Sequence, residues 1–275
     1  MKVAMVSPLE MKVPPMGYGG VELVVSLLTE ELVRRGHDVT LFASGDSVTS
    51  GKLQAICPTH LRGSPRHKEI LSMLNVVSCM EQAKDFDIIH NHTTFEGMAI
   101  ASLVRIPMLT TLHGHLKGDW LELFAHYRGW YNTISLAARN LLPQKDHFAG
   151  VIHNAIEVES YPFNGGKREP FLLFLSRMSQ EKGPHLAIEV ARELDCRLIL
   201  AGNIDLVDEH YFNTFVLPQI DGDQIQYIGE ANQEQKRELL MRTRCLLAPI
   251  CWPEPFGLFM IEAMACGTPV VAFNR

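Results

Sequence analysis

Two glutamates, Glu254 and Glu262, have seven residues between them at a predicted junction of a loop and a helix. Gly257 interrupts regular structure near the first glutamate, and the apolar run 258–265, which ends before Gly267, is typical of a helix. Glu254 is therefore expected in the loop and Glu262 about one turn inside the helix. Both carboxylates can then face one pocket, although isolated acidic residues of this kind are more often simply solvated.

The beginning of this predicted helix offers backbone donors to the same pocket. The first N–H groups of a helix have no partner within the helix, so they suit an anion or a hydroxyl group. We expect the N–H groups of Leu258, Phe259 and Met260 to point into the space beside the two carboxylates. The segment therefore predicts a site for an anionic or hydroxyl-rich ligand.

A second charged segment follows the predicted strand 171–175. Arg177 and Lys182 precede a predicted helix that has Pro184 in its first turn. A guanidinium group, an ammonium group and the free N–H groups of a helix together form a plausible cradle for a diphosphate. A solvated surface loop with incidental charges explains this segment about equally well when it is considered alone.

A glycine-rich loop, residues 14–20, connects the first predicted strand to a helix. Gly19 and Gly20 would let the backbone approach a phosphate or a sugar closely. The loop lacks the pattern G-x-G-x-x-G, and no acidic residue ends the second predicted strand, which disfavours a dehydrogenase. A purely structural turn accounts for the loop equally well.

Four histidines form two pairs near the ends of predicted strands: His90 with His92, and His113 with His115. In an extended chain both rings of such a pair lie on one face, as metal ligands do. We expect no bound metal, because no carboxylate directly completes either pair as a ligand set. Ordinary hydrogen-bonded histidines or the lining of a carbohydrate site remain alternatives.

Composition limits the class of protein. The chain has 275 residues, 47% of them hydrophobic, which is enough for the cores of two domains. A net charge of -6, without a long run of Lys or Arg, argues against a nucleic-acid partner. Six cysteines without a C-x-x-C motif indicate reduced thiols in a cytoplasmic protein. No apolar run reaches the roughly 18 residues of a membrane span, and loose contact with a membrane surface stays compatible with the sequence.

Predicted strands alternate with predicted helices along the whole chain, as in parallel sheets covered by helices. The polar, turn-rich segment 164–170 is predicted to be a linker between domains of residues 1–163 and 171–275. The fold class is therefore α/β, with ligands expected at the carboxyl ends of the strands. The predicted strands are 3–7, 38–43, 87–90, 108–112, 132–135, 150–153, 171–175, 197–201, 225–228, 245–249 and 269–273, and the predicted helices include 20–35, 184–194, 233–242 (with Asn232 as N-cap) and 258–265.

Six short motifs occur in order: Gly19-Gly20-Val21-Glu22, Asp87-Ile-Ile-His-Asn-His92, Thr111-Leu-His-Gly114, His153-Asn-Ala-Ile156, Ser176-Arg177 with Lys182-Gly183, and Glu254 with Glu262. Together they resemble the retaining glycosyltransferases of family 4. The resemblance implies the GT-B fold, two Rossmann-like domains whose parallel sheets face each other across a cleft. It implies a hexosyltransferase-type enzyme of carbohydrate biosynthesis, which transfers a sugar from a nucleotide diphosphate sugar to an acceptor with retention of anomeric configuration.

The resemblance also implies roles for residues in the second domain. Arg177 and Lys182 would neutralise the diphosphate leaving group, Glu262 would hold the ribose hydroxyls, and Glu254 would contact the hydroxyls of the donor sugar. The N–H groups of residues 258–260 would bind the same donor. No metal and no cofactor besides the donor substrate is implied.

In the first domain, the acceptor side, His113 would hydrogen-bond to the transferred sugar, and Gly19 and Gly20 would approach the diphosphate and the acceptor. The acceptor can be a carbohydrate, a lipid or a small molecule. Ala155 stands where the family often has glycine, and the family continues beyond the strand that ends near residue 273. The resemblance therefore implies an incomplete second domain.

Three other functions remain open from the sequence. A chain with an incomplete second domain could be an inactive remnant that binds nucleotide sugars. The two H-x-H pairs could belong to a metal-dependent hydrolase. An epimerase of the GT-B fold that acts on a nucleotide sugar is the third alternative.

Overall fold

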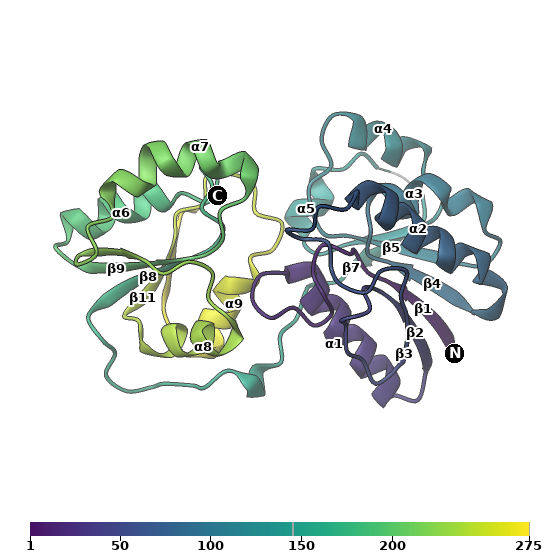
Figure 1. The fold of residues 1–275 in the computed structure, drawn as a ribbon, viewed down its shortest axis with the longest axis horizontal. Helices are drawn as coiled ribbons and strands as arrows, with labels where there is room; N and C mark the ends of the chain where they lie inside the picture. Colours follow the sequence, from purple (N-terminus) through teal and green to yellow (C-terminus); the bar gives the residue numbers. More distant parts are fainter. Residues whose placement is uncertain (145, 275) are drawn as a thin grey trace. The chain divides into compact units, whose positions relative to one another are not determined.

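The computed structural model describes residues 1–144 and 146–274, and its contacts divide the chain into two compact units, Met1–Ala155 and Ile156–Arg275. In each unit, helices cover both faces of a parallel sheet (Figure 1). The expected α/β class with two parallel sheets is confirmed. No helix among the described residues combines the length and apolar character that crossing a membrane requires.

Within the described residues, the first unit has a seven-stranded sheet in the order β3-β2-β1-β4-β5-β6-β7, with every neighbouring pair parallel. Parallel strands bring their carboxyl ends to one edge of the sheet, where the connecting loops can form a site. The strands are β1 (Lys2–Val6), β2 (Asp38–Phe42), β3 (Lys52–Gln54), β4 (Ile88–Asn91), β5 (Met108–Leu112), β6 (Trp130–Thr133) and β7 (Phe148–Val151).

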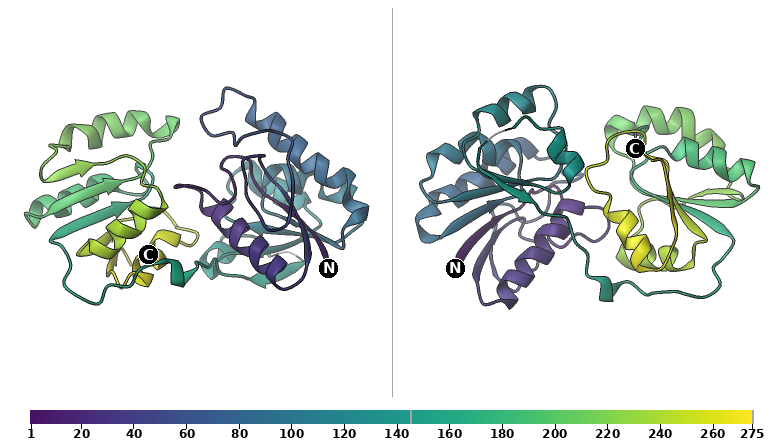
Figure 2. Two further views of the ribbon diagram at one scale, coloured as in Figure 1. Left: turned by 60° about the horizontal axis from the view of Figure 1, so that its bottom comes forward. Right: turned by 180° about the vertical axis from the view of Figure 1, so that it is seen from behind.

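The helices of the first unit pack in two layers (Figure 2). Val25 of α1 packs with strand residues on one face, whereas Val76, Met98 and Phe124 of α2, α3 and α4 pack on the other. Apolar side chains from both faces of the sheet are therefore removed from water. The helices are α1 (Gly20–Arg34), α2 (Lys68–Glu81), α3 (Phe95–Ile100), α4 (Asp119–His126) and α5 (Leu136–Asn140), with 3-10 turns at Ala83–Asp85, Ala101–Leu103 and Val158–Ser160, the last in the second unit.

The second unit has a five-stranded parallel sheet in the order β10-β9-β8-β11-β12 within the described residues. The central strand β8 is buried along its whole length, which explains its continuous apolar sequence. The strands are β8 (Phe171–Leu175), β9 (Arg197–Ala201), β10 (Ile225–Tyr227), β11 (Cys245–Ala248) and β12 (Val270–Ala272).

Helices lie on both faces of this second sheet (Figure 1). Ile188 of α6 packs on one face with Phe212, and Leu240 of α8 packs on the other with Ala263 of α9. Asn232 is the N-cap of α8 as predicted, because its side chain accepts a hydrogen bond from the N–H of Gln235 at 2.9 Å. The helical segments are α6 (Pro184–Glu193), Leu206–Asp208, α7 (Glu209–Tyr211), Phe212–Val216, Leu217–Gln219, α8 (Gln233–Arg242) and α9 (Leu258–Ala265).

The contacts separate the two units after Ala155, earlier than the predicted linker at residues 164–170. Two residues of this segment, Asn164 and Arg168, make hydrogen bonds to other residues of the second unit. The N–H of Asn164 donates to the carbonyl of Cys266 at 3.1 Å, and the Arg168 guanidinium donates to the carbonyl of Met241 at 2.8 Å.

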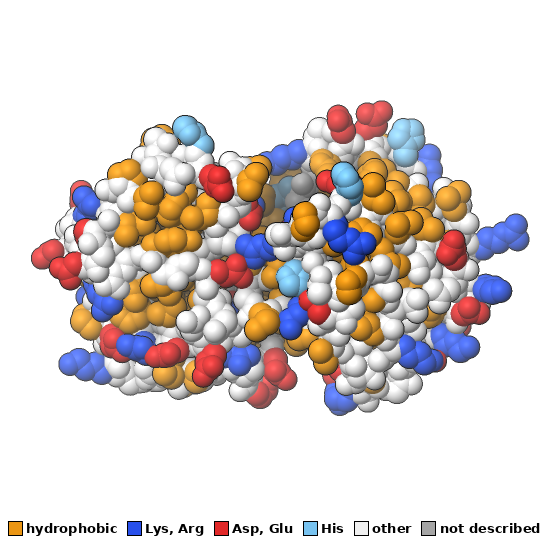
Figure 3. All heavy atoms as spheres, in the orientation of Figure 1, with side chains coloured by type: hydrophobic (Ala, Val, Ile, Leu, Met, Phe, Trp, Pro, Cys, Tyr) orange, Lys and Arg blue, Asp and Glu red, His pale blue; other side chains and the backbone are white. Residues whose placement is uncertain are grey.

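Charged side chains are mixed on the surface. Figure 3 shows Lys and Arg interspersed with Asp and Glu on the visible face of each unit, without an extended patch of positive charge. This distribution agrees with the net charge of -6.

Candidate functional site

Helix α9 begins directly after Gly257, which has the left-handed value φ = 82°. A Cβ atom at this position would lie 2.1 Å from the Cε of Met260. A larger residue would therefore clash with Met260 and would also be strained by the positive φ. The N–H of Met260 donates to the carbonyl of Gly257 at 3.0 Å. Of the three N–H groups predicted to be free for a ligand, that of Met260 is therefore used within the chain.

Glu262 lies in the second turn of α9 and is 3% exposed. Its Oε1 accepts hydrogen bonds from the hydroxyl of Tyr161 at 2.7 Å and from the ammonium of Lys236 at 2.6 Å. Burial and the adjacent carboxylate raise the pKa of Tyr161, so its hydroxyl stays a donor. The two contacts fix one carboxylate oxygen and orient the other, Oε2.

Lys182 and Glu254 form an ion pair in which the Nζ of Lys182 donates to the Oε2 of Glu254. The indole N–H of Trp252 donates to the same oxygen at 2.9 Å. The ammonium also lies 5.2 Å from the ring centre of Trp252 and 5.9 Å from that of Phe259. Because only 13% of the Lys182 side chain is exposed, a solvated surface loop is the wrong interpretation of this position.

The loop that carries Lys182 is held close to the neighbouring strand. Gly183 has φ = 77°, and a Cβ atom there would lie 2.3 Å from the carbonyl oxygen of Pro249, just after β11. Only glycine permits this approach. It brings Lys182 toward the segment that contains Glu254.

Arg177 lies among three carboxylates at the carboxyl ends of β8 and β9. Its guanidinium is 2.5 Å from Glu181, 3.4 Å from Asp205 and 3.2 Å from Asp208. Burial raises the pKa of Asp208, and the nearby Arg177 opposes that rise. The structure thus holds Arg177 in contacts with acidic groups of its own unit.

The structure brings Lys182, Glu254 and Phe259 into contact within the second unit. Glu262 has a separate set of contacts through Tyr161 and Lys236. The sequence interpretation missed both of these partners, which are 101 and 26 positions from Glu262. It also missed Trp252, Asp205 and Asp208. Of these three residues, only Trp252 is close in sequence to a predicted site residue, two positions before Glu254.

The glycine-rich loop of the first unit ends at Gly19, the N-cap of α1, with φ = 134°. A Cβ atom there would lie 2.8 Å from the Cβ of Pro15, so the close turn requires glycine. Glu22, in the first turn of α1, is 4% exposed and accepts a hydrogen bond from the N–H of Met11 at 3.2 Å. Burial raises the pKa of Glu22 to about 7.

Three of the four histidine rings lie against one another, with His92 buried and His90 and His113 partly buried. The ring centres of His90 and His92 are 4.2 Å apart, and the Nδ1 of His92 is 2.8 Å from the Nε2 of His113. The His90 Nε2 lies 2.8 Å from the Thr111 hydroxyl, which itself donates to Asn132, so His90 must donate this bond. Burial lowers the pKa of His90 to about 4, that of His113 to about 3, and that of His92 well below its usual value. The rings are therefore neutral near pH 7.

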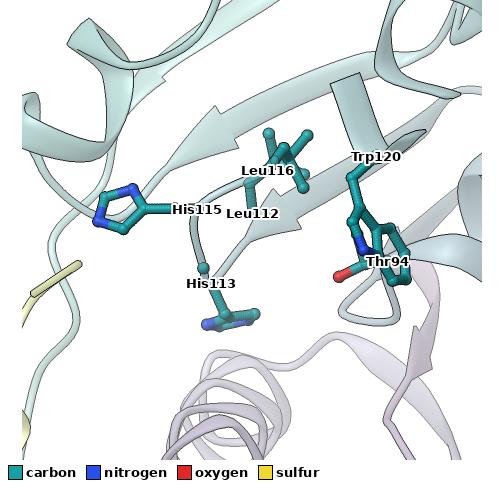
Figure 4. A pocket seen from close by; sticks show the side chains of 7 residues that line it. Thr94, Leu112, His113, His115, Leu116 and Trp120 are labelled. Carbon is teal, nitrogen blue, oxygen red and sulfur yellow. The ribbon is translucent and has the colours of Figure 1, made fainter. Parts of the chain in front are cut away.

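The two histidine pairs differ in geometry. His90 and His92 share one face as expected, but His113 and His115 point in different directions (Figure 4). The expectation for the second pair is wrong because β5 ends at Leu112, so the chain is no longer extended there. No group of three or more His, Cys, Asp or Glu side chains in the described parts of the chain is arranged to hold a metal ion.

A cavity of about 200 Å³ lies beside His113, at the carboxyl end of β5. Figure 4 shows Trp120 and Thr94 on one side of it, with His113 and His115 projecting from the connecting loop. The remaining lining residues are Leu112, Gly114 and Leu116.

Comparison with known proteins gives consistent matches over the whole chain. Residues 18–160 match the family model described as "Glycosyltransferase Family 4", and residues 157–275 match "Glycosyl transferases group 1". The alpha-maltose-1-phosphate synthase of Mycolicibacterium smegmatis is 27% identical, and the alignment covers 99% of this chain and 79% of that protein. These matches give no support to the metal-dependent hydrolase.

Two solved structures resemble this chain over its full length. AviGT4, a glycosyltransferase involved in avilamycin A biosynthesis, has 27% identity and a TM-score of 0.74, with coverage of 100% of this chain and 79% of that chain. Anabaena Alr3699/HepE, solved in complex with UDP-glucose, has 21% identity and a TM-score of 0.71, with coverage of 100% and 81%.

Proposed function

Because the chain belongs to glycosyltransferase family 4 and has the GT-B fold with two Rossmann-like domains, we propose that it transfers a sugar from a nucleotide diphosphate sugar to an acceptor with retention of anomeric configuration. The glycosyltransferase class follows from the family. Retention, the residue roles and the substrates are the proposed parts.

The ion pair of Lys182 and Glu254 is the observation that best supports the proposal. A cation that suits a diphosphate and a carboxylate that suits sugar hydroxyls lie in contact, although each is largely removed from water. A nucleotide diphosphate sugar presents both kinds of group close together. Its diphosphate can pair with Lys182, and its sugar hydroxyls can donate to Glu254 once that carboxylate is released.

The same exchange applies to Arg177. Its contacts with Glu181, Asp205 and Asp208 keep the cation neutralised, and a bound diphosphate would replace one or more of these carboxylates. During transfer, negative charge builds on the departing nucleoside diphosphate. Arg177, Lys182 and the N–H groups of Leu258 and Phe259 would stabilise that charge without a metal ion.

Glu262 is proposed to bind the ribose through Oε2, because Oε1 is already occupied by Tyr161 and Lys236. In the first unit, neutral His113 would hydrogen-bond to the transferred sugar, and the loop at Gly19 and Gly20 would contact the diphosphate and acceptor. We expect no resident cofactor or metal. The cysteines at all six positions are free thiols, which agrees with a cytoplasmic protein.

The experiment that tests the proposal measures release of UDP, GDP or ADP from a panel of the corresponding nucleotide sugars. One class of donor should be consumed, and the same nucleoside diphosphate should raise the melting temperature, since a ligand at 100 times its Kd stabilises by about 2.7 kcal/mol. Binding without any turnover would instead support an inactive nucleotide-sugar-binding protein. A nucleotide sugar interconverted without an acceptor would indicate an epimerase.

A further inference from the structure

We infer that His92 is a positioning residue for His113. The Nδ1 of His92 donates a hydrogen bond to the Nε2 of His113, which keeps the proton of His113 on its other ring nitrogen, Nδ1. His113 then offers a hydrogen-bond donor to the transferred sugar. The inference rests on the proposed function, in which His113 binds that sugar, and it adds which nitrogen binds and what controls its proton.

The sheet of the first unit brings the two rings together. His92 directly follows β4 and His113 directly follows β5, and these two strands are parallel neighbours. Their carboxyl ends therefore lie at the same edge of the sheet. The Nδ1 of His92 is 2.8 Å from the Nε2 of His113, and the ring centres are 5.1 Å apart.

The ring of His92 is held in place from several sides. His92 is 3% exposed, and its backbone N–H donates to the carbonyl of Val6 at 2.9 Å. Its ring centre lies 4.2 Å from that of His90. The side chain of Asn91 accepts from the N–H and the hydroxyl of Thr93 at 3.1 and 2.7 Å, which fixes the turn around His92. A side chain locked in this way can align a neighbouring functional group.

The surroundings of His92 decide which ring donates. Burial lowers the pKa values of His92 and His113, so both rings are neutral and each carries one proton. If His113 donated through Nε2, the proton of His92 would lie on its own Nε2, which is buried and has no partner among the described residues. Among backbone groups, buried N–H donors without an acceptor are rarer than buried acceptors without a donor. The same order applied to the ring places the proton of His92 on Nδ1.

This arrangement determines what His113 can offer a sugar. Its Nε2 accepts from His92, so its proton lies on Nδ1. His113 also lines the cavity at the carboxyl end of β5 (Figure 4), and Nδ1 is the ring nitrogen that remains for a ligand. An N–H at Nδ1 donates to an oxygen of the sugar, whereas a bare nitrogen only accepts.

NMR of the protein with 15N-labelled histidine rings tests the position of the proton, because long-range correlations distinguish protonated from bare ring nitrogens. The signals of His113 are those that disappear in His113→Ala. We expect the proton on Nδ1 in both His92 and His113. His90 is a reference in the same spectrum, because its Nε2 must donate to Thr111. In His92→Leu, the form of His113 that is protonated on Nε2 should appear.

Turnover tests the consequence for the reaction. In metal sites, losing the partner that fixes the tautomer of a histidine costs about 10–100-fold, and we expect His92→Leu to lower kcat about tenfold or more. Its Kd for the free nucleoside diphosphate should stay close to that of wild type, because this ligand lacks the sugar. His92→Asn keeps an amide donor near the position of Nδ1 and should recover most of the turnover. His60→Leu is the matched control: the Nδ1 of His60 also has a partner at 2.8 Å, Asp46, and the variant should turn over donor like wild type.

The inference is overturned if His113 carries its proton on Nε2 in wild type, a measurement that depends on neither a substrate nor the folding of a variant. It is also overturned if His92→Leu keeps full turnover, or if folded His92→Asn loses as much turnover as His92→Leu. The proposed function fails separately if no nucleotide sugar binds or is consumed.

Discussion

Lys182 and Glu254 form a direct ion pair although they are 72 positions apart in the sequence. Both belong to the second unit, and each is proposed to contact a different part of one donor. The pair means that neither residue is a simple solvated charge. Its removal should therefore affect both the stability of the fold and the activity.

The variant Lys182→Ala should lower turnover by about 100-fold or more, because a fixed cation near a developing charge is lost. It should also lower the free energy of unfolding by up to about 3 kcal/mol, because it leaves the carboxylate of Glu254 buried without its partner. Urea unfolding and donor turnover measure the two effects.

The double variant Lys182→Ala/Glu254→Ala distinguishes the two roles. It should regain much of the lost stability, since no unpaired charge remains, but none of the activity. Lys52→Ala breaks a pair with Asp38 that is far more exposed, and it should change neither property. Full activity in Lys182→Ala would remove Lys182 from the donor site.

The two glutamates should respond differently to two ligands. Glu262→Ala should weaken binding of the free nucleoside diphosphate and of the intact nucleotide sugar, because both contain ribose. Glu254→Ala should chiefly weaken binding of the nucleotide sugar, since only that ligand carries the sugar. Calorimetric titration of both variants with both ligands decides the assignment, and equal losses in all four titrations would refute it.

Glu22 should make stability depend on pH. Its pKa is raised from 4.5 to about 7 in the folded protein, so the folded state keeps a proton that the unfolded chain releases. The contribution of Glu22 to the free energy of unfolding is fully present below pH 4.5. It falls by about 3 kcal/mol as the pH rises from 4.5 to about 7, and it does not change further above pH 7. The histidines His90, His92 and His113 act in the opposite direction, because their lowered pKa values destabilise the fold as pH falls below 6.5.

Comparison with Glu22→Gln isolates this effect, because glutamine stays neutral and the histidines are unchanged. The variant should gain stability relative to wild type between pH 4.5 and 7. The exposed Glu69→Gln serves as the control and should follow wild type at each pH. A constant difference between wild type and Glu22→Gln across this range would show that Glu22 is ionised normally.

Activity should survive EDTA, and His113→Ala should impair transfer. The Nε2 of His113 is paired with His92 Nδ1, so these two nitrogens contact each other and not a shared ion. The variant should also lose some stability, because it leaves a buried nitrogen of His92 without its partner. Stoichiometric zinc with EDTA-sensitive activity would contradict the assignment of His113 to the sugar.

Local sequence patterns predicted much of the fold. The strands at 108–112, 171–175 and 197–201 and the helices at 233–242 and 258–265 have the expected bounds, because continuous apolar runs, caps and glycines are local signals. Strand β3 (Lys52–Gln54) was missed because all three residues are exposed and the strand lies at an edge. Helix α2 (Lys68–Glu81) was also missed; its N-cap, His67, makes no side-chain capping bond.

The contacts of the site could not be predicted in the same way. Tyr161 reaches Glu262 across 101 positions, and Glu254 reaches Lys182 across 72. Such pairs depend on how strands are ordered in the sheet, and no local pattern encodes that order. The turn after β5 likewise separated His113 from His115, although their spacing is the same as that of His90 and His92.

The central claim is tested most directly by incubating the chain with its preferred nucleotide sugar and a methyl glycoside acceptor, and determining the product by proton NMR. We expect release of the nucleoside diphosphate and a new glycosidic bond with the same anomeric configuration as the donor. The transfer should be lost in Lys182→Ala and retained in Lys52→Ala. A product of inverted configuration, or the absence of any donor consumption across the UDP, GDP and ADP sugars, would contradict the account.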